Sequence, residues 1–167
     1  DPYRPLDNAN EPVEVQVIAL QWKWLFLYPE QNIATVNKLV IPEKRPINFT
    51  ITADAPMNSF WIQKLGGQVY AMNGMSTKLH LIADYVDEYD GVSANISGEG
   101  FADMRFKVHS LSNKDFDEWI NQSKASNKIL DNETYQELAE PAVIETPEIF
   151  SSYTPSLYNT IISKYMS

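Results

Sequence analysis

The sequence contains no cysteine, and its 167 residues include only two histidines. Without cysteine the chain can form neither a disulfide framework nor a thiolate metal site. Positive charge is also scarce, because 13 lysines and arginines stand against 22 aspartates and glutamates, for a formal net charge of -9. Contacts to phosphate groups need a basic surface, so this balance argues against a nucleic-acid-binding function.

Long apolar runs are missing as well. No stretch approaches the roughly 20 apolar residues of a membrane span, and residues 1–12 lack the apolar core of a signal peptide. The abrupt start suggests an ectodomain excised from a longer, membrane-anchored protein. The hydrophobic share of 44% and the aromatic share of 12% predict an ordered chain, whose length suits one domain or one domain with an appendage.

Apolar and polar residues alternate in the first part of the chain. Val13, Val15 and Val17 are separated by Glu14 and Gln16, which is typical of a half-buried strand. Further β-branched or aromatic runs, divided by proline and glycine, lie at 22–28, 38–41, 47–53, 78–83, the opening of 89–95, and 104–109. Many short strands without intervening helices favour an antiparallel sandwich or barrel.

The pattern becomes helical after residue 110. Asn113 is expected to cap a first helix, in which apolar residues recur at helical spacing. A second helix is expected over 133–140, and a third is expected to begin at Thr154 and Pro155. We therefore predict three parts in chain order: a linker over 1–12, a β domain over 13–110 and a helical extension over 111–167.

Segment 89–104, with the sequence YDGVSANISGEGFADM, has the spacing of a metal-binding loop but almost no side chain that binds metal. If Ser93 and Ser97 were cysteines, and Phe101 and the distant Asn58 were histidines, these side chains would hold a pair of copper ions. The reason is that soft sulfur ligands suit copper. The positions concerned are Asn58 and, on the loop, Ser93, Asn95, Ser97, Phe101 and Met104.

These positions resemble the copper site, called CuA, of subunit II of haem-copper oxidases. In copper-binding members the loop carries Cys, Glu, Cys, His and Met, so that only Met104 is retained here. Two further segments, LQWKWLFLYPEQNIATVNKLVIP at 20–42 and MNSFWIQKLGGQVYAMNGM at 57–75, resemble the branch of the family that oxidises quinol. The C-terminal segment also resembles the extension of quinol oxidase subunits.

The resemblance implies a mainly β fold, a cupredoxin-like Greek-key β-sandwich with a C-terminal α-helical extension, in agreement with the strand pattern. It implies the extracytoplasmic domain of quinol oxidase subunit II, on the outer face of the bacterial cytoplasmic membrane and preceded by two membrane helices. The complex would oxidise quinol, reduce oxygen to water and pump protons. Its haems and copper are expected in subunit I.

For this domain the resemblance implies a structural role. We expect no catalytic, cofactor-binding or metal-binding residue in it, and no docking of cytochrome c, because the copper that would receive electrons has been lost. The expected partners are subunit I and the other oxidase subunits. The contact with subunit I is expected at the end bearing Asn58 and the loop over 91–104.

Two other function classes stay open from the residues alone. A free-standing cupredoxin-like electron carrier or binding module would need a copper site, which the ligand inventory argues against. A secreted adhesion module would fit the fold without further support. We expect His80 and His109 to be packed or solvated rather than to bind a metal. The aromatic run over 22–28 is expected to pack in a core or an interface. Glu30 and Glu99 are expected to be solvated.

Overall fold

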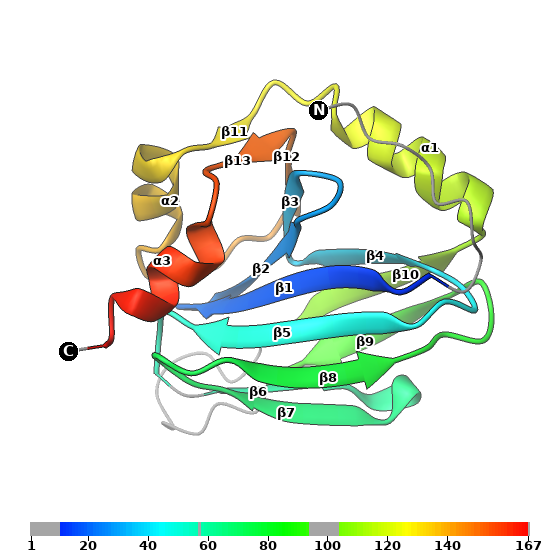
Figure 1. The fold of residues 1–167 in the computed structure, drawn as a ribbon, viewed down its shortest axis with the longest axis horizontal. Coiled ribbons are helices and arrows are strands. Elements are labelled where there is room, and N and C mark those ends of the chain that lie inside the picture. Colours follow the sequence, from blue (N-terminus) through cyan, green and yellow to red (C-terminus); the bar gives the residue numbers. More distant parts are fainter. Residues whose placement is uncertain (1–10, 57, 94–103, 167) are drawn as a thin grey trace.

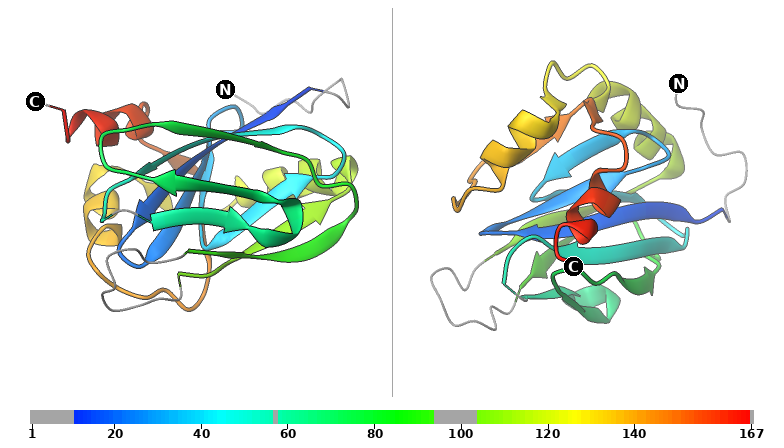
Figure 2. Two further views of the ribbon diagram at one scale, coloured as in Figure 1. Left: turned by 90° about the horizontal axis from the view of Figure 1, so that it is seen from below. Right: turned by 60° about the vertical axis from the view of Figure 1, so that its left-hand side comes forward.

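The computed structural model describes residues 11–56, 58–93 and 104–166. Two β-sheets pack face to face, and the helices of the C-terminal segment lie around the outside of this sandwich (Figures 1 and 2). The predicted mainly β architecture with a C-terminal segment containing helices is therefore confirmed. No helix in the described part of the chain is both long and apolar enough to cross a membrane.

The larger sheet contains six strands. Val17 of one central strand lies opposite Ile51 of its parallel neighbour, and the other pairs are antiparallel. In spatial order the strands are β12 (Glu148–Phe150), β3 (Ile33–Val36), β2 (Lys23–Tyr28), β1 (Val13–Leu20), β5 (Ile47–Ala53) and β8 (Thr77–Leu81).

The smaller sheet contains five strands. Its first two strands are parallel to each other, so each sheet of the predicted sandwich contains one parallel pair among its antiparallel ones. The chain reaches these parallel neighbours by crossing between the sheets rather than through hairpins. In spatial order the strands are β4 (Lys38–Pro42), β10 (Phe106–Leu111), β9 (Asp87–Val92), β6 (Asn58–Ile62) and β7 (Gly67–Ala71), with a 3-10 turn η1 (Gln63–Leu65) between β6 and β7.

Strand β2 is buried on both of its faces. Trp24, Phe26 and Tyr28 point between the two sheets, whereas Leu25 and Leu27 point outward into a second apolar cluster. Successive strand side chains alternate between faces, so this continuous apolar run serves two cores at once. The inner core is rich in rings: the centroids of Trp24 and Phe60 are 5.4 Å apart.

The C-terminal segment contains helices α1 (Asn113–Ser123), α2 (Asn132–Leu138) and α3 (Leu157–Ser163), and also short strands β11 (Ile129–Leu130) and β13 (Ser152–Tyr153). The N-cap of α1 is Ser112, whose hydroxyl accepts a hydrogen bond from the Asp115 amide at 3.1 Å. The prediction of Asn113 as the cap is wrong, because Asn113 is already helical. The third helix likewise begins at Leu157 rather than at Thr154 and Pro155, and the second ends at Leu138 rather than at 140.

The part of this segment from β11 to α3 packs against the outward face of the larger sheet, whereas Phe116 and Ile120 of α1 join the inner core beside β4 and β10. Apolar side chains of the β11 to α3 part meet those of β1 and β2 in the second apolar cluster, whose members from the segment are Leu130, Tyr135, Leu138, Phe150, Leu157, Tyr158 and Ile161. Strand β12 also pairs with β3, with Ile149 opposite Thr35. The C-terminal segment is thus joined to the sandwich both by side-chain packing and by the backbone.

Candidate functional site

The structure brings together three of the six positions expected to correspond to a copper site. Asn58 begins β6, Ser93 follows β9 directly, and Met104 lies two residues before β10. Because β9 pairs with both β6 and β10, the ends of these strands meet at one place. The other three positions, Asn95, Ser97 and Phe101, lie outside the described residues.

Hydrogen bonds connect these three side chains to one another. The Ser93 hydroxyl donates to Oδ1 of Asn58 at 2.9 Å, and Nδ2 of Asn58 donates to the sulfur of Met104 at 3.5 Å. The Met104 carbonyl accepts a hydrogen bond from the indole nitrogen of Trp24 at 3.1 Å. All three side chains are buried. Buried polar groups form hydrogen bonds within the protein, and the amide of Asn58 does so with Ser93 and Met104.

These residues do not fit a copper pair. Copper sites of this kind use thiolate and imidazole ligands, whereas Asn58 and Ser93 offer a neutral amide and a neutral hydroxyl. A serine hydroxyl does not ionise at neutral pH in the way that a cysteine thiol does beside a metal. Met104 supplies a thioether, a weak ligand by itself, and its sulfur already accepts a hydrogen bond.

The two histidines lie on different sheets. Nδ1 of His80 on β8 is 2.7 Å from Oδ1 of Asn48, and Nδ1 of His109 on β10 is 3.4 Å from a carboxylate oxygen of Glu88. Burial and the positive charge of Lys38 lower the pKa of His109, although Glu88 opposes the shift. Within the described ranges, no three histidine, cysteine, aspartate or glutamate side chains are placed to hold a metal ion.

A buried carboxylate that the sequence did not single out connects the sandwich to two helices. Asp54 follows β5, and its side chain is only 4% exposed. It accepts hydrogen bonds from the Tyr135 hydroxyl at 2.6 Å, from the Lys164 ammonium at 2.7 Å and from the Tyr165 hydroxyl. We call these four residues the Asp54 cluster. Burial alone would raise the pKa of Asp54, but these hydrogen bonds outweigh it and lower the pKa.

A buried cation holds the end of α2. Lys23 is 1% exposed, and its ammonium donates to the carbonyls of Gln21 at 3.0 Å, Leu138 at 2.6 Å and Glu140 at 2.8 Å. These three bonds use all three ammonium protons. Burial lowers the pKa of Lys23, while the carboxylates of Glu148 and Glu140 oppose that shift.

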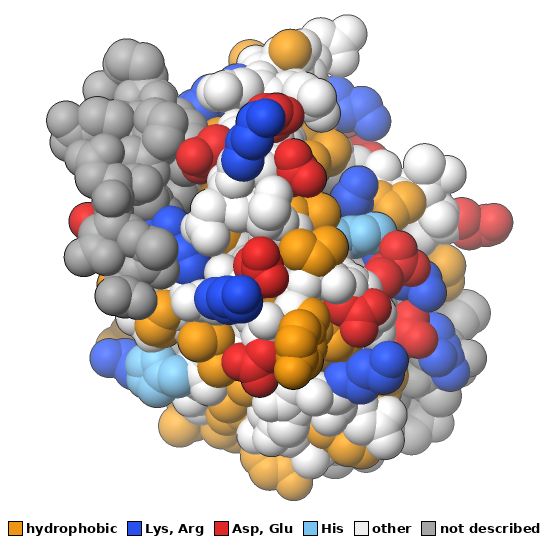
Figure 3. Space-filling view, turned by 90° about the vertical axis from the view of Figure 1, so that its right-hand side faces the viewer, with side chains coloured by type: hydrophobic (Ala, Val, Ile, Leu, Met, Phe, Trp, Pro, Cys, Tyr) orange, Lys and Arg blue, Asp and Glu red, His pale blue; other side chains and the backbone are white. Residues whose placement is uncertain are grey.

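The face opposite the Asn58 end has mixed character where its residues are described. Figure 3 shows acidic and basic side chains interspersed there with apolar ones. Exposed apolar residues in the connection from β8 to β9 are Ile82, Tyr85 and Val86. Mixed charge of this kind is usual for a solvated surface.

Comparison with known proteins finds close relatives. Residues 124–167 match the family described as the COX Aromatic Rich Motif. The chain is 53% identical over 165 residues to cytochrome bo(3) ubiquinol oxidase subunit 2 of Pseudomonas putida, covering 99% of this chain and 52% of that protein. It is 51% identical over 168 residues to ubiquinol oxidase subunit 2 of Acetobacter aceti, covering 99% and 54%. The chain spans about half the length of these curated relatives.

Quinol oxidase subunit 2 of Bacillus cereus is 44% identical over 134 residues, which cover 80% of this chain and 46% of that protein. Among solved structures, the periplasmic domain of subunit II of cytochrome oxidase from Bradyrhizobium japonicum superposes with a TM-score of 0.63 at 17% identity, covering 66% of this chain and 91% of that one. At this identity the likeness concerns the fold alone. It confirms the predicted cupredoxin-like β-sandwich.

Proposed function

Because the chain belongs to the family of quinol oxidase subunit 2, we propose that it is the extracytoplasmic domain of the second subunit of a proton-pumping terminal oxidase. The complex oxidises quinol and reduces oxygen to water. The domain lies on the outer face of the bacterial cytoplasmic membrane and follows two membrane helices. Subunit I holds the haems and the catalytic copper, and the domain caps and stabilises that subunit.

The contact of Asn58 with Ser93 and Met104 is the observation that carries the copper-free part of this proposal. In a copper-binding relative, a metal would join the strand ends at these positions. Here a neutral amide joins them through hydrogen bonds at 2.9 and 3.5 Å. Quinol dissolves in the lipid and can deliver electrons within or beside the membrane, so the complex needs no copper relay at its outer surface and no docked cytochrome c.

Exposed apolar side chains support an interface at the Asn58 end. The connection between β7 and β8 lies beside this end, because Asn73 accepts a hydrogen bond from the Ala55 amide at 3.2 Å. Met75 of that connection is exposed, and so are Tyr165 and Met166 near the end of the chain. Uncovered apolar groups gathered in one area commonly mark an interface. We place the contact with subunit I on this end of the sandwich.

The experiment that tests the assignment uses the full-length gene product. It would be tagged, purified gently from its native membrane, and assayed for haem and for oxygen consumption driven by quinol and by reduced cytochrome c. Bound haem with activity on quinol alone is the expected result. A haem-free monomer would contradict the proposal, and stoichiometric copper in that monomer would favour the electron-carrier alternative.

A separate measurement tests the absence of CuA. Copper added to the purified protein is expected to give no mixed-valence electron paramagnetic resonance signal, and such a signal with stoichiometric copper would refute the expectation. A positive control would restore the ligand types on the same scaffold, through the combined substitutions Asn58→His, Ser93→Cys, Asn95→Glu, Ser97→Cys and Phe101→His. We expect this variant to bind two copper ions and to become coloured.

A further inference from the structure

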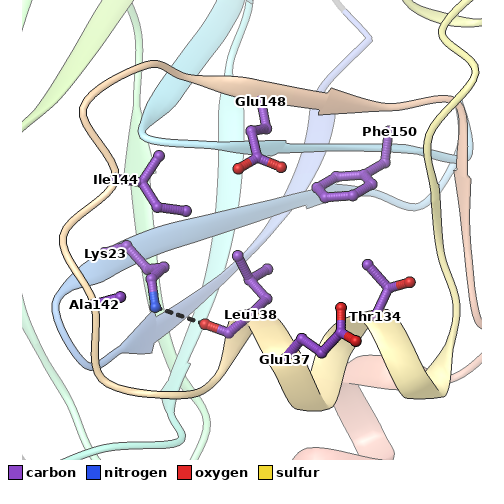
Figure 4. Close-up of a pocket in the computed structure, with 8 residues that line it drawn as sticks. All are labelled: Lys23, Thr134, Glu137, Leu138, Ala142, Ile144, Glu148 and Phe150. Carbon is purple, nitrogen blue, oxygen red and sulfur yellow. Dashed lines mark hydrogen bonds between the residues drawn. The ribbon is translucent and has the colours of Figure 1, made fainter.

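A pocket of about 240 Å³ lies between α2, β12 and the start of β2. Figure 4 shows Glu137 on α2 and Glu148 on β12 on opposite sides of this space, with the carboxylate of each directed toward it. Apolar side chains of Leu138, Ile144 and Phe150 form much of the remaining wall. The pocket therefore combines apolar walls with two carboxylates and the one ammonium of Lys23.

The cations of the chain offset the charge of Glu148 more than that of Glu137. Lys23 lies at the pocket, where three carbonyls hold its ammonium in place, and its positive charge attracts the carboxylate of Glu148. Lys128 reaches Glu148 at 3.5 Å, and the Lys128 side chain is 54% exposed, so water weakens this pair. Among the residues that the structure describes, Glu137 has no basic partner within ion-pair distance.

We propose that this pocket receives one lysine or arginine side chain from another subunit of the oxidase. The inference rests on the proposed function, since it needs an assembled complex. The aliphatic part of such a side chain would lie against Leu138, Ile144 and Phe150, and its cationic end would meet Glu137 and Glu148. Lysine and arginine commonly bury their stems against apolar surface in this way.

The size of the pocket favours a single side chain over a cofactor or an organic substrate. Pockets for small molecules usually measure about 300–1,000 Å³, and this one falls below that range. Two carboxylates are also few for a hard metal ion, because calcium takes about six to eight oxygen ligands. A lysine or arginine side chain fits both the volume of the pocket and the charge of its carboxylates.

The position of the pocket agrees with an occupant from a neighbouring subunit. The rim includes Ala142, whose amide donates to the Gln21 carbonyl in the turn between β1 and β2 at 3.2 Å. The same end of β2 carries Trp24, which contacts Met104 through its indole nitrogen. The pocket therefore opens close to the end of the sandwich that we place against subunit I.

The test uses the full-length subunit in the assembled oxidase. A Glu137→Gln/Glu148→Gln variant keeps the shape of both side chains and removes both charges. Glu133→Gln is the matched control, because Glu133 is an exposed residue of the same helix that does not line the pocket. The measured quantity is the haem retained per tagged subunit after washing the immobilised complex at rising salt concentrations.

We expect the double variant to lose its haem-containing partner at lower salt than the wild type and Glu133→Gln, with about tenfold weaker retention at a fixed salt concentration. Retention equal to that of Glu133→Gln would overturn the inference while leaving the proposed function intact. A wild-type subunit without haem at the lowest salt would overturn both. If the double variant fails to accumulate, Glu137→Gln alone carries the same comparison, since Glu137 is exposed and pairs with no base in the described chain.

Discussion

Replacing Asp54 by asparagine should weaken the attachment of α2 and of the end of α3 to the sandwich. Asparagine is nearly the same size, but it is neutral and presents an amide nitrogen where the carboxylate accepts hydrogen bonds. The Tyr135 hydroxyl is buried and would lose a charged acceptor, which costs about 1.5–3 kcal/mol. The Lys164 side chain is 49% exposed, so its pair with Asp54 adds at most about 1 kcal/mol. We expect Asp54→Asn to lower the free energy of unfolding by about 2–4 kcal/mol.

Urea unfolding of the purified domain, followed by tryptophan fluorescence and circular dichroism, would measure this loss. Asp131→Asn is the matched control. Asp131 is the N-cap of α2 and accepts a hydrogen bond from the Thr134 amide at 2.8 Å, and asparagine caps helices about as well as aspartate. If both variants unfolded at the wild-type urea concentration, the Asp54 cluster would not be a source of stability and the reasoning would be refuted.

The same cluster predicts how stability depends on pH. The pKa of Asp54 is lowered in the fold, so its contribution is present above the unfolded pKa of about 3.9 and disappears as the pH falls through the folded value. Burial and the neighbouring Asp54 carboxylate raise the pKa of Tyr165 to about 12. The contribution of Tyr165 is therefore complete below about pH 10 and is lost as the pH rises toward 12. In Asp54→Asn the loss of stability in acid should be smaller than in the wild type.

Three further substitutions test other parts of the structure. Lys23→Met removes the ammonium that binds the carbonyls at the end of α2 and should cost about 2–3 kcal/mol in urea unfolding; an unchanged midpoint would contradict this. Tyr28→Phe removes the hydroxyl that bonds both the amide and the carbonyl of Val40 and should cost about 1–3 kcal/mol by the same assay. Gly91→Ala would place a methyl group 2.0 Å from the Phe106 ring, so we expect a fall in melting temperature corresponding to about 1–3 kcal/mol.

Much of the fold follows from periodic patterns. The alternation from Val13 to Val17 correctly indicates β1, and the run over 47–53 coincides with β5. Strand β3 was not indicated, because its four residues are all buried and show no alternation. The parallel pairing of β1 with β5 could not be predicted either, since it depends on how the chain crosses between sheets rather than on a local pattern.

The functional region was predictable to different degrees. The spacing of the loop, together with the family resemblance, led to Asn58, Ser93 and Met104, which the structure brings together. The correspondence of Asn95, Ser97 and Phe101 to copper ligands stays a prediction. The Asp54 cluster gave no sequence signal, because its partners lie 81 to 111 residues away in the chain. Lys23 was missed for the same reason, since its helical carbonyls are 115 and 117 residues distant.

The pairing of β12 with β3 also affects self-association. Without β12, strand β3 would be an edge strand whose free amides and carbonyls could pair with a second molecule, as uncovered sheet edges do in aggregation. Strand β12 covers this edge and is itself only three residues long, which makes it a poor template for another strand. The C-terminal segment therefore protects the sheet from edge-to-edge pairing with a second copy, and a chain truncated before residue 148 should tend to form aggregates.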